Sequence, residues 1–182
     1  MRPDLDHWLA HPTIRVPHRR TASVGEAELW DAARTVRVAD TRVLGRLVRW
    51  RIPGVPKSIA YDELFRAPPF MVLHEDERVL VCGLVGRIWT LRRDYPALSG
   101  PDEFRAWSEP GTARVVFANW VEPAGSRRST LVSETRVRVT DRDGRVGLAG
   151  VRPLIAAAHA LIGREAMTVA VRRAEETAEP RR

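Results

Sequence analysis

A few polar side chains are predicted to lie among apolar ones, where such groups bind ligands or take part in catalysis. Asn119 lies in the run ARVVFANWVEP, two residues after Phe117. A buried amide needs hydrogen-bond partners, which a ligand, a buried water or the nearby Ser133 can supply. Thr135 shares the strand face of Ser133, because side chains alternate along a strand. We expect Phe117, Asn119, Ser133 and Thr135 to contact a ligand.

A second group of candidates lies elsewhere in the chain. His159, in the run LIAAAHALIGREAMTVAV, is on a predicted buried helix, with Ile162 near the same side. An imidazole there can act as an acid or base, or hydrogen-bond a ligand, although a structural histidine is the alternative. Trp89 is expected to point inward, for a ligand or for core packing alone. The ligand-binding candidates are Trp89, Phe117, Asn119, Ser133, Thr135, His159 and Ile162, and no catalytic residue is assigned.

Several familiar chemistries are not predicted. His7 and His11 are four residues apart, but no carboxylate at ligand spacing completes a metal site. Cys82 lies between Val81 and Gly83 and resembles a buried small apolar residue more than a nucleophile. Glycine-rich phosphate loops and the G-x-S-x-G turn are absent from the sequence. We therefore expect no metal and no cofactor.

The polar candidates must be positioned by a hairpin. The runs TARVVFANWVEP and RSTLVSETRVRVTD predict two long strands joined by a tight turn at AGS. Three charged residues share one side of the second strand and predict a face in water: Glu134, Arg136 and Arg138. The opposite, inner side then carries Leu131, Ser133, Thr135, Val137 and Val139.

The register of this hairpin decides which residues of the first strand face inward. A three-residue turn places Val115, Phe117, Asn119 and Val121 on the inner side. A one-residue slip would instead bring in Val116, Ala118 and Trp120.

The sequence of the N-terminal half predicts one strand and several short helices. Residues 1–12 are expected to form a loosely attached arm, and residues 13–22 alternate as a strand, at an edge or bulge because of Pro17. Ser23 and Glu26 have the spacing of a capping box and predict a helix start. A second helix is expected from a cap at Asp40 or Thr41 to about Trp50, and the stretch SIAYDELF is a third.

The C-terminal half predicts mainly strands and one long helix. From Phe70, two strands are joined at the acidic turn HEDE. The run PDEFRAWSEPG is expected to form a loop with one helical turn. After the hairpin, a helix is expected from a first turn at Pro153 to about Ala178, followed by a tail over residues 179–182. Residues 13–178 would form a single domain with an α+β layout.

Charge is the most unusual global property. The 182 residues carry a net charge of +7, and of the 30 basic residues only Lys57 is a lysine. Such charge is typical of nucleic-acid binders, but the arginines are scattered along the chain. Arg42, Arg46 and Arg49 lie opposite apolar residues and predict the solvated side of a helix. We expect no specific nucleic acid as a partner and no membrane span, and the single cysteine fits the cytoplasm.

Three segments together resemble a known superfamily. The strand–helix opening with Trp30, the hairpin VEPAGSRRSTLVSETRVRV and the closing GREAMTVAVRRAEE are similar to START/polyketide-cyclase (Bet v 1-like, SRPBCC) proteins, above all to uncharacterised bacterial members. The resemblance implies a helix-grip fold, in which a curved antiparallel sheet wraps around a long C-terminal helix, with two short helices after the first strand. It also implies a hydrophobic cavity between sheet and helix.

Three functions are consistent with these features. The first is binding of a small apolar ligand, lipid-like or polyketide-like, in that cavity. The second is a cyclase or dehydratase type of enzyme that uses His159 and Asn119 there. The third is an interaction protein, for example a homodimer formed through exposed Trp8, Trp50 or Trp107.

Overall fold

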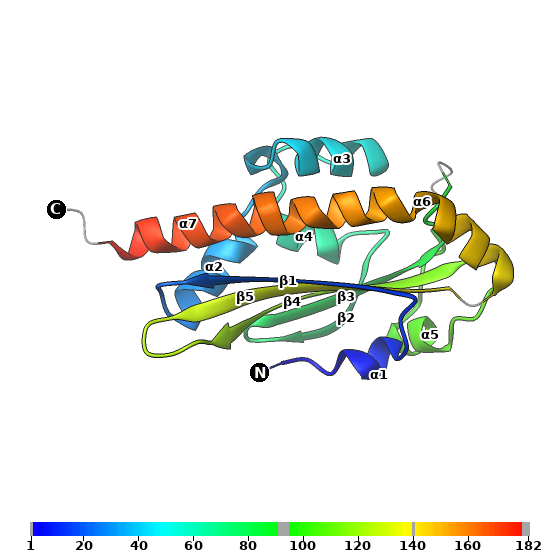
Figure 1. Ribbon diagram of the computed structural model, residues 1–182, viewed down its shortest axis with the longest axis horizontal. Helices are drawn as coiled ribbons and strands as arrows, with labels where there is room; N and C mark the ends of the chain where they lie inside the picture. Colours follow the sequence, from blue (N-terminus) through cyan, green and yellow to red (C-terminus); the bar gives the residue numbers. More distant parts are fainter. Residues whose placement is uncertain (1, 91–94, 140, 180–182) are drawn as a thin grey trace.

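The centre of the protein is a five-stranded antiparallel sheet with strand order β1-β5-β4-β3-β2 (Figure 1). The computed structural model describes residues 2–90, 95–139 and 141–179, apart from the side chains of 142, 152, 154–159, 162 and 163. The strands are β1 (Ile14–Ala22), β2 (Met71–Asp76), β3 (Val79–Gly86), β4 (Ala113–Pro123) and β5 (Ser129–Val139). β1 lies at an edge of the sheet, which is where Pro17 was expected to place it.

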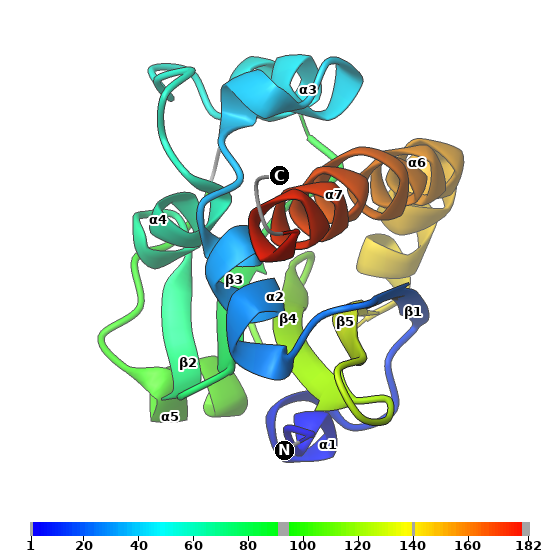
Figure 2. The ribbon, with the colours of Figure 1, turned by 90° about the vertical axis from the view of Figure 1, so that its left-hand side faces the viewer.

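Helices cover both faces of the sheet. On one face lies the long C-terminal helix, made of α6 (Arg142–Leu161), a π-helical turn (Ile162–Ala166) and α7 (Met167–Ala178). Figure 2 shows α2 (Glu26–Arg34) and α4 (Tyr61–Arg66) on the same side, with α3 (Val43–Arg51) farther out, and α1 (Leu5–Leu9) and α5 (Pro101–Ala106) on the opposite side. A 3-10 turn (Val38–Asp40) precedes α3. The predicted α+β helix-grip fold is confirmed.

The β4–β5 hairpin has the predicted register. Asn119 lies opposite Ser133, and Phe117 lies opposite Thr135, on the face that the C-terminal helix covers. The slipped register is wrong, since Trp120 packs on the other face against α1. The loop spans residues 124–128 and is longer than the three residues expected, yet it keeps the same side chains inward.

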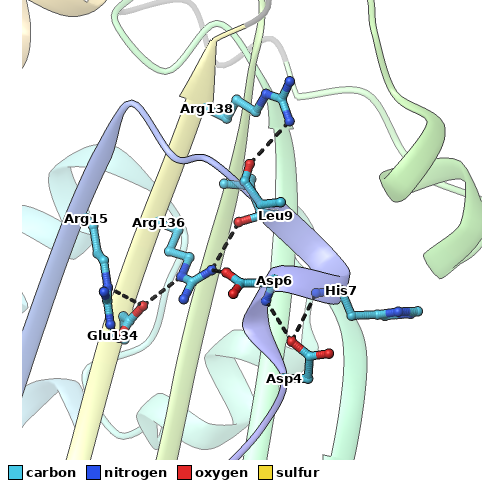
Figure 3. A network of polar contacts seen from close by, with 9 residues as sticks. Asp4, Asp6, His7, Leu9, Arg15, Glu134, Arg136 and Arg138 are labelled. Atoms are coloured by element: carbon cyan, nitrogen blue, oxygen red, sulfur yellow. Dashed lines mark hydrogen bonds and ion pairs between the residues drawn. The ribbon is translucent and has the colours of Figure 1, made fainter.

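The outer face of β5 corrects a prediction. Glu134 and Arg136 do not face water: their exposed fractions are 2% and 5%. The Glu134 carboxylate accepts two hydrogen bonds of 2.9 Å from Arg15 on β1 and one of 2.6 Å from Arg136 (Figure 3). These ions are buried because they neutralise one another, whereas the sequence pattern was interpreted as three independent solvated charges.

The N-terminal segment is the cover over these charges, so the expectation of a loosely attached arm is wrong. Leu5 and Leu9 of α1 are buried against the outer face. Arg136 donates to the Asp6 carboxylate and to the Leu9 carbonyl, and Arg138 donates to the carbonyl of Ala10 (Figure 3). Each arginine thus ties β5 to α1 or to the residue that follows it.

Two predicted helix caps are replaced by contacts from the C-terminal helix. α2 begins after Gly25, and the amide of Ser23 donates to Glu175, so the predicted capping box does not form. α3 begins after Arg42, and its first amides, of Val43 and Leu44, donate to the carboxylate of Glu165 at 3.0–3.1 Å. Local spacing could not reveal acceptors that lie more than 100 residues away.

The C-terminal helix starts at Arg142, so the predicted start at Pro153 is also wrong. Pro153 lies within α6, and the glycine-rich run before it is helical. Those glycines admit Trp89: a Cβ on Gly147 would lie 2.6 Å from its indole nitrogen. The end at Ala178 was predicted correctly. Within the described residues no helix combines the length and the apolar character that crossing a bilayer requires.

Candidate functional site

A cavity of about 410 Å³ lies between the inner face of the sheet and the helices that cover it. Its floor comes from β3, β4 and β5, and its roof from α2, α3, α4 and the C-terminal helix. Most of the lining side chains are aliphatic or aromatic. A space of this size and character falls in the range of small-molecule sites.

The floor combines apolar side chains with one polar pair. Val115 and Phe117 of β4 face the cavity beside Asn119, and Ser133 lies opposite Asn119 on β5. The side-chain amide of Asn119 and the hydroxyl of Ser133 form no hydrogen bond with any other described residue. Asn119 is half-buried and Ser133 is buried, and both groups are available to bind a polar atom of a guest molecule or of water.

Aromatic rings close one side of the cavity. Phe117 packs between Phe65 of α4 and Phe70, with ring centroids 5.4 and 5.6 Å apart. Phe65 and Phe70 also contact each other at 5.0 Å. The contacts of Phe70 with Phe65 and with Phe117 are edge-to-face, the Phe65–Phe117 contact is tilted, and all three residues line the cavity.

Two ionised groups that line the cavity, Asp62 and Arg34, are held in ion pairs. Asp62 lines it and binds Arg66 at 2.9 Å, and Arg34 lies 3.7 Å away. Arg66 also binds Glu75, and this hydrogen bond lowers the pKa of the Glu75 carboxyl. The charged form of the Glu75 carboxyl is therefore favoured. These contacts are structural ion pairs that join α4 to β2.

Tyr61 is the other titratable group of this wall. Its hydroxyl lies 2.6 Å from the Thr41 hydroxyl. Burial raises the pKa of Tyr61 to about 12, so the phenol stays protonated. It offers a neutral donor or acceptor next to the apolar lining.

Residues at and after the end of α3 also line the cavity. Trp50 lines it and is 53% exposed, and Ile52, Thr90 and Tyr95 are half-buried lining residues. The guanidinium of Arg51 lies 5.1 Å from the centre of the Tyr95 ring, a cation–π contact. This part of the lining therefore includes two aromatic side chains.

The structure brings four of the seven predicted site residues to the cavity wall: Trp89, Phe117, Asn119 and Ser133. Thr135 is buried on the same sheet face but does not line the cavity. The side chains of His159 and Ile162 lie outside the described part, and so does the alanine-rich run around His159. Ligand contact by any of these seven residues stays a prediction.

Sequence reasoning missed much of the roof. Trp30, Phe65 and Met167 line the cavity, but they were not predicted as site residues because no polar residue near them in the sequence suggests a binding site. Their signal was only a helical apolar pattern, which core packing explains equally well. Which apolar residues border a void depends on how α3 and α4 are placed, and loops rich in proline and glycine determine that.

The remaining chemical candidates have other surroundings. Burial raises the pKa of the Cys82 thiol to about 12, so it carries no thiolate at neutral pH. His7 contacts Arg105 and the Trp8 ring. The described residues contain no group of three or more His, Cys, Asp or Glu side chains arranged for a metal ion. Trp8 and Trp107, expected to be exposed, are half-buried on the outer face, whereas Trp50 is exposed as predicted.

Comparisons with solved structures find neighbours of low sequence identity. Norcoclaurine synthase from Thalictrum flavum, in complex with dopamine and hydroxybenzaldehyde, is 12% identical, with 92% of this chain and 89% of that chain covered and a TM-score of 0.41. The Zhui aromatase/cyclase from Streptomyces sp. R1128 is 14% identical, with 92% and 99% covered and a TM-score of 0.40.

A third neighbour extends over almost the whole chain. A hypothetical protein from Helicobacter pylori is 8% identical, with 98% of this chain and 96% of that chain covered and a TM-score of 0.40. No protein-family model matches the sequence, and no curated protein matches it. At this similarity nothing about a ligand or reaction is transferred to this chain.

Proposed function

We propose that this protein binds a small, mainly apolar molecule, lipid-like or polyketide-like, in the cavity between the sheet and the C-terminal helix. The observation that carries the proposal is the cavity of about 410 Å³ with its apolar lining and the Asn119–Ser133 pair on its floor. Filling an apolar space is favourable by about 25 cal/mol for each Å² of apolar surface removed from water. The polar pair would orient the guest through a hydroxyl or carbonyl group.

The polar pair also argues for a guest that is not purely hydrocarbon. A guest that excluded water from the Asn119 amide or the Ser133 hydroxyl without binding it would lose about 1–3 kcal/mol, which one hydrogen bond from the guest would offset. The floor strands place only neutral side chains at the cavity, so the chemistry available on the floor is neutral hydrogen bonding. An enzymatic role through His159 stays a prediction, because the side chain of that residue lies outside the described part.

The test uses Ser133→Phe, which places a ring in the middle of the floor, and Ser133→Ala, which keeps the space open. The probe is 1-anilinonaphthalene-8-sulfonate, whose fluorescence rises in apolar sites. We expect the wild type and Ser133→Ala to bind it and Ser133→Phe to lose most of the binding while still folding cooperatively.

Thermal unfolding of the same variants provides the control. Overpacking a filled core costs about 1–3 kcal/mol, whereas a ring entering a real cavity costs less. Equal probe binding by all three proteins, or strong destabilisation by Ser133→Phe alone, would contradict the proposal. Native mass spectrometry against lipids and aromatic polyketides would then identify the class of guest.

A further inference from the structure

The segment that forms α3 has an unusual charge. No acidic residue occurs between Asp40 and Asp62, whereas five basic residues lie there: Arg42, Arg46, Arg49, Arg51 and Lys57. α3 is also the outermost helix on the cavity side of the molecule (Figures 1 and 2). A local positive field therefore surrounds an element that projects from the rest of the protein.

The outer face of α3 mixes arginines with exposed apolar groups. At 100° per residue, the helical positions of this face fall within one third of a turn. Arg42, Arg46 and Arg49 are exposed. Val43 and Trp50 are 52% and 53% exposed, and they are two of the three large apolar residues that the described part leaves so exposed.

The inner face of α3 is already occupied. Leu44, Leu47 and Val48 line the cavity, and Leu44 is buried. The outer face of α3 is therefore a separate surface, on which basic and apolar side chains lie together. No ion pair joins Arg42, Arg46 or Arg49 to another residue in the described ranges.

We propose that this outer face, made of Arg42, Val43, Arg46, Arg49 and Trp50, docks the protein on an anionic lipid surface. Tryptophan is enriched at the membrane–water interface, and basic side chains close to the surface are attracted to anionic headgroups. The arginines would contact lipid phosphates, and Trp50 and Val43 would enter the headgroup layer.

The shape of the face favours a bilayer over a nucleic acid. A single nine-residue helix offers no groove for a phosphate backbone, and only one aromatic ring lies on this face for base stacking. Trp50 also lines the cavity. Docking through this face would place that lining residue against the lipid, although the docking itself does not depend on the cavity having a ligand.

The test is sedimentation of the full-length protein with lipid vesicles. One set contains phosphatidylcholine alone, and the other contains about 30% phosphatidylglycerol, because anionic headgroups attract basic side chains. We expect binding only to the anionic vesicles, weakening as salt rises. Arg46→Glu combined with Arg49→Glu should weaken it roughly tenfold or more.

The matched control is Arg128→Glu combined with Arg172→Glu, which changes the net charge equally at exposed positions outside α3. It should bind within about threefold of the wild type. Val43→Gln, which keeps every charge, should also weaken binding. Circular dichroism and probe binding in the cavity should be unchanged in all these variants.

Three results would overturn the proposal. One is no binding to the anionic vesicles at low salt, and another is an equal loss in both double variants, which would reflect net charge alone. The third is tighter binding of single-stranded RNA that Arg46→Glu with Arg49→Glu abolishes. Because cavity binding is measured separately with the fluorescent probe, failure of docking is distinguishable from failure of the proposed function.

Discussion

Glu134 is a carboxylate held inside the protein by two arginines on neighbouring strand positions. Its side chain is 2% exposed, and the side chain of Arg136 beside it, taken without the backbone, is 6% exposed. Burial alone would raise the pKa of Glu134, but the hydrogen bonds from Arg15 and Arg136 outweigh it and hold the pKa below its ordinary value. The carboxylate is therefore charged at neutral pH, and the arginines depend on it for neutralisation.

Glu134→Gln should destabilise the protein by about 3 kcal/mol, because removing one partner leaves buried charge uncompensated. Urea unfolding at neutral pH measures this change. Glu176→Gln is the control, since its pair with Arg172 is 65–68% exposed and should contribute less than about 1 kcal/mol. Similar losses in both variants would contradict the interpretation of a buried network.

At the residue scale the sequence predicted which side chains share a face but not what covers each face. Alternation along β5 placed Ser133 inward and Arg136 outward, and both placements are correct. Whether an outward residue meets water depends on a distant partner. Asp6 supplies that partner from α1, and nothing in the spacing along β5 encodes it.

The π-helical turn in the C-terminal helix binds α3 to the rest of the fold. Glu165 accepts hydrogen bonds from the first two amides of α3, which has no capping side chain at its own N-terminus. A carboxylate at that position satisfies unpaired amides and interacts favourably with the helix dipole. This contact holds the roof of the cavity at the end remote from Trp50.

Removing this contact should loosen α3 without unfolding the protein. In Glu165→Ala, loss of a cap worth about 1 kcal/mol should make amide exchange in Val43–Arg51 roughly fivefold faster. Hydrogen exchange followed by mass spectrometry measures it. Glu176→Ala removes a carboxylate from the same C-terminal helix and should leave α3 unchanged; unchanged exchange in both variants would exclude the tether.

At the element scale, helix ends near turn-forming residues could be predicted, whereas starts that depend on distant partners could not. Pro153 suggested a helix start, but the true start lies at Arg142, where glycines let the helix pack on Trp89. The residues of the cavity roof could not be predicted from the sequence either. Only the folded placement of α3 over the sheet shows that Leu47 and Val48 border a void.

Across the described part of the molecule, the pKa shifts of the carboxyl groups all have the same sign. In the described part, each Asp or Glu with a clearly altered pKa has it lowered, by hydrogen bonds or by arginines: Asp6, Asp40, Glu75, Glu103, Glu122, Glu134 and Asp141. A carboxyl whose folded-state pKa is depressed contributes stability above its unfolded pKa. That contribution disappears as pH falls through the folded-state value.

The protein should therefore be insensitive to pH between 7 and about 5 and lose stability steeply below about pH 4. Protonation also adds to a net charge that is already +7, so repulsion reinforces the loss. Urea unfolding at a series of pH values measures it. Glu134→Gln should show a shallower decline, because the groups that face this side chain, Arg15 and Arg136, no longer lose a carboxylate on acidification. A stability that stays constant to pH 3, or a decline equally steep in the variant, would contradict the assignment of this network as the acid-sensitive part of the fold.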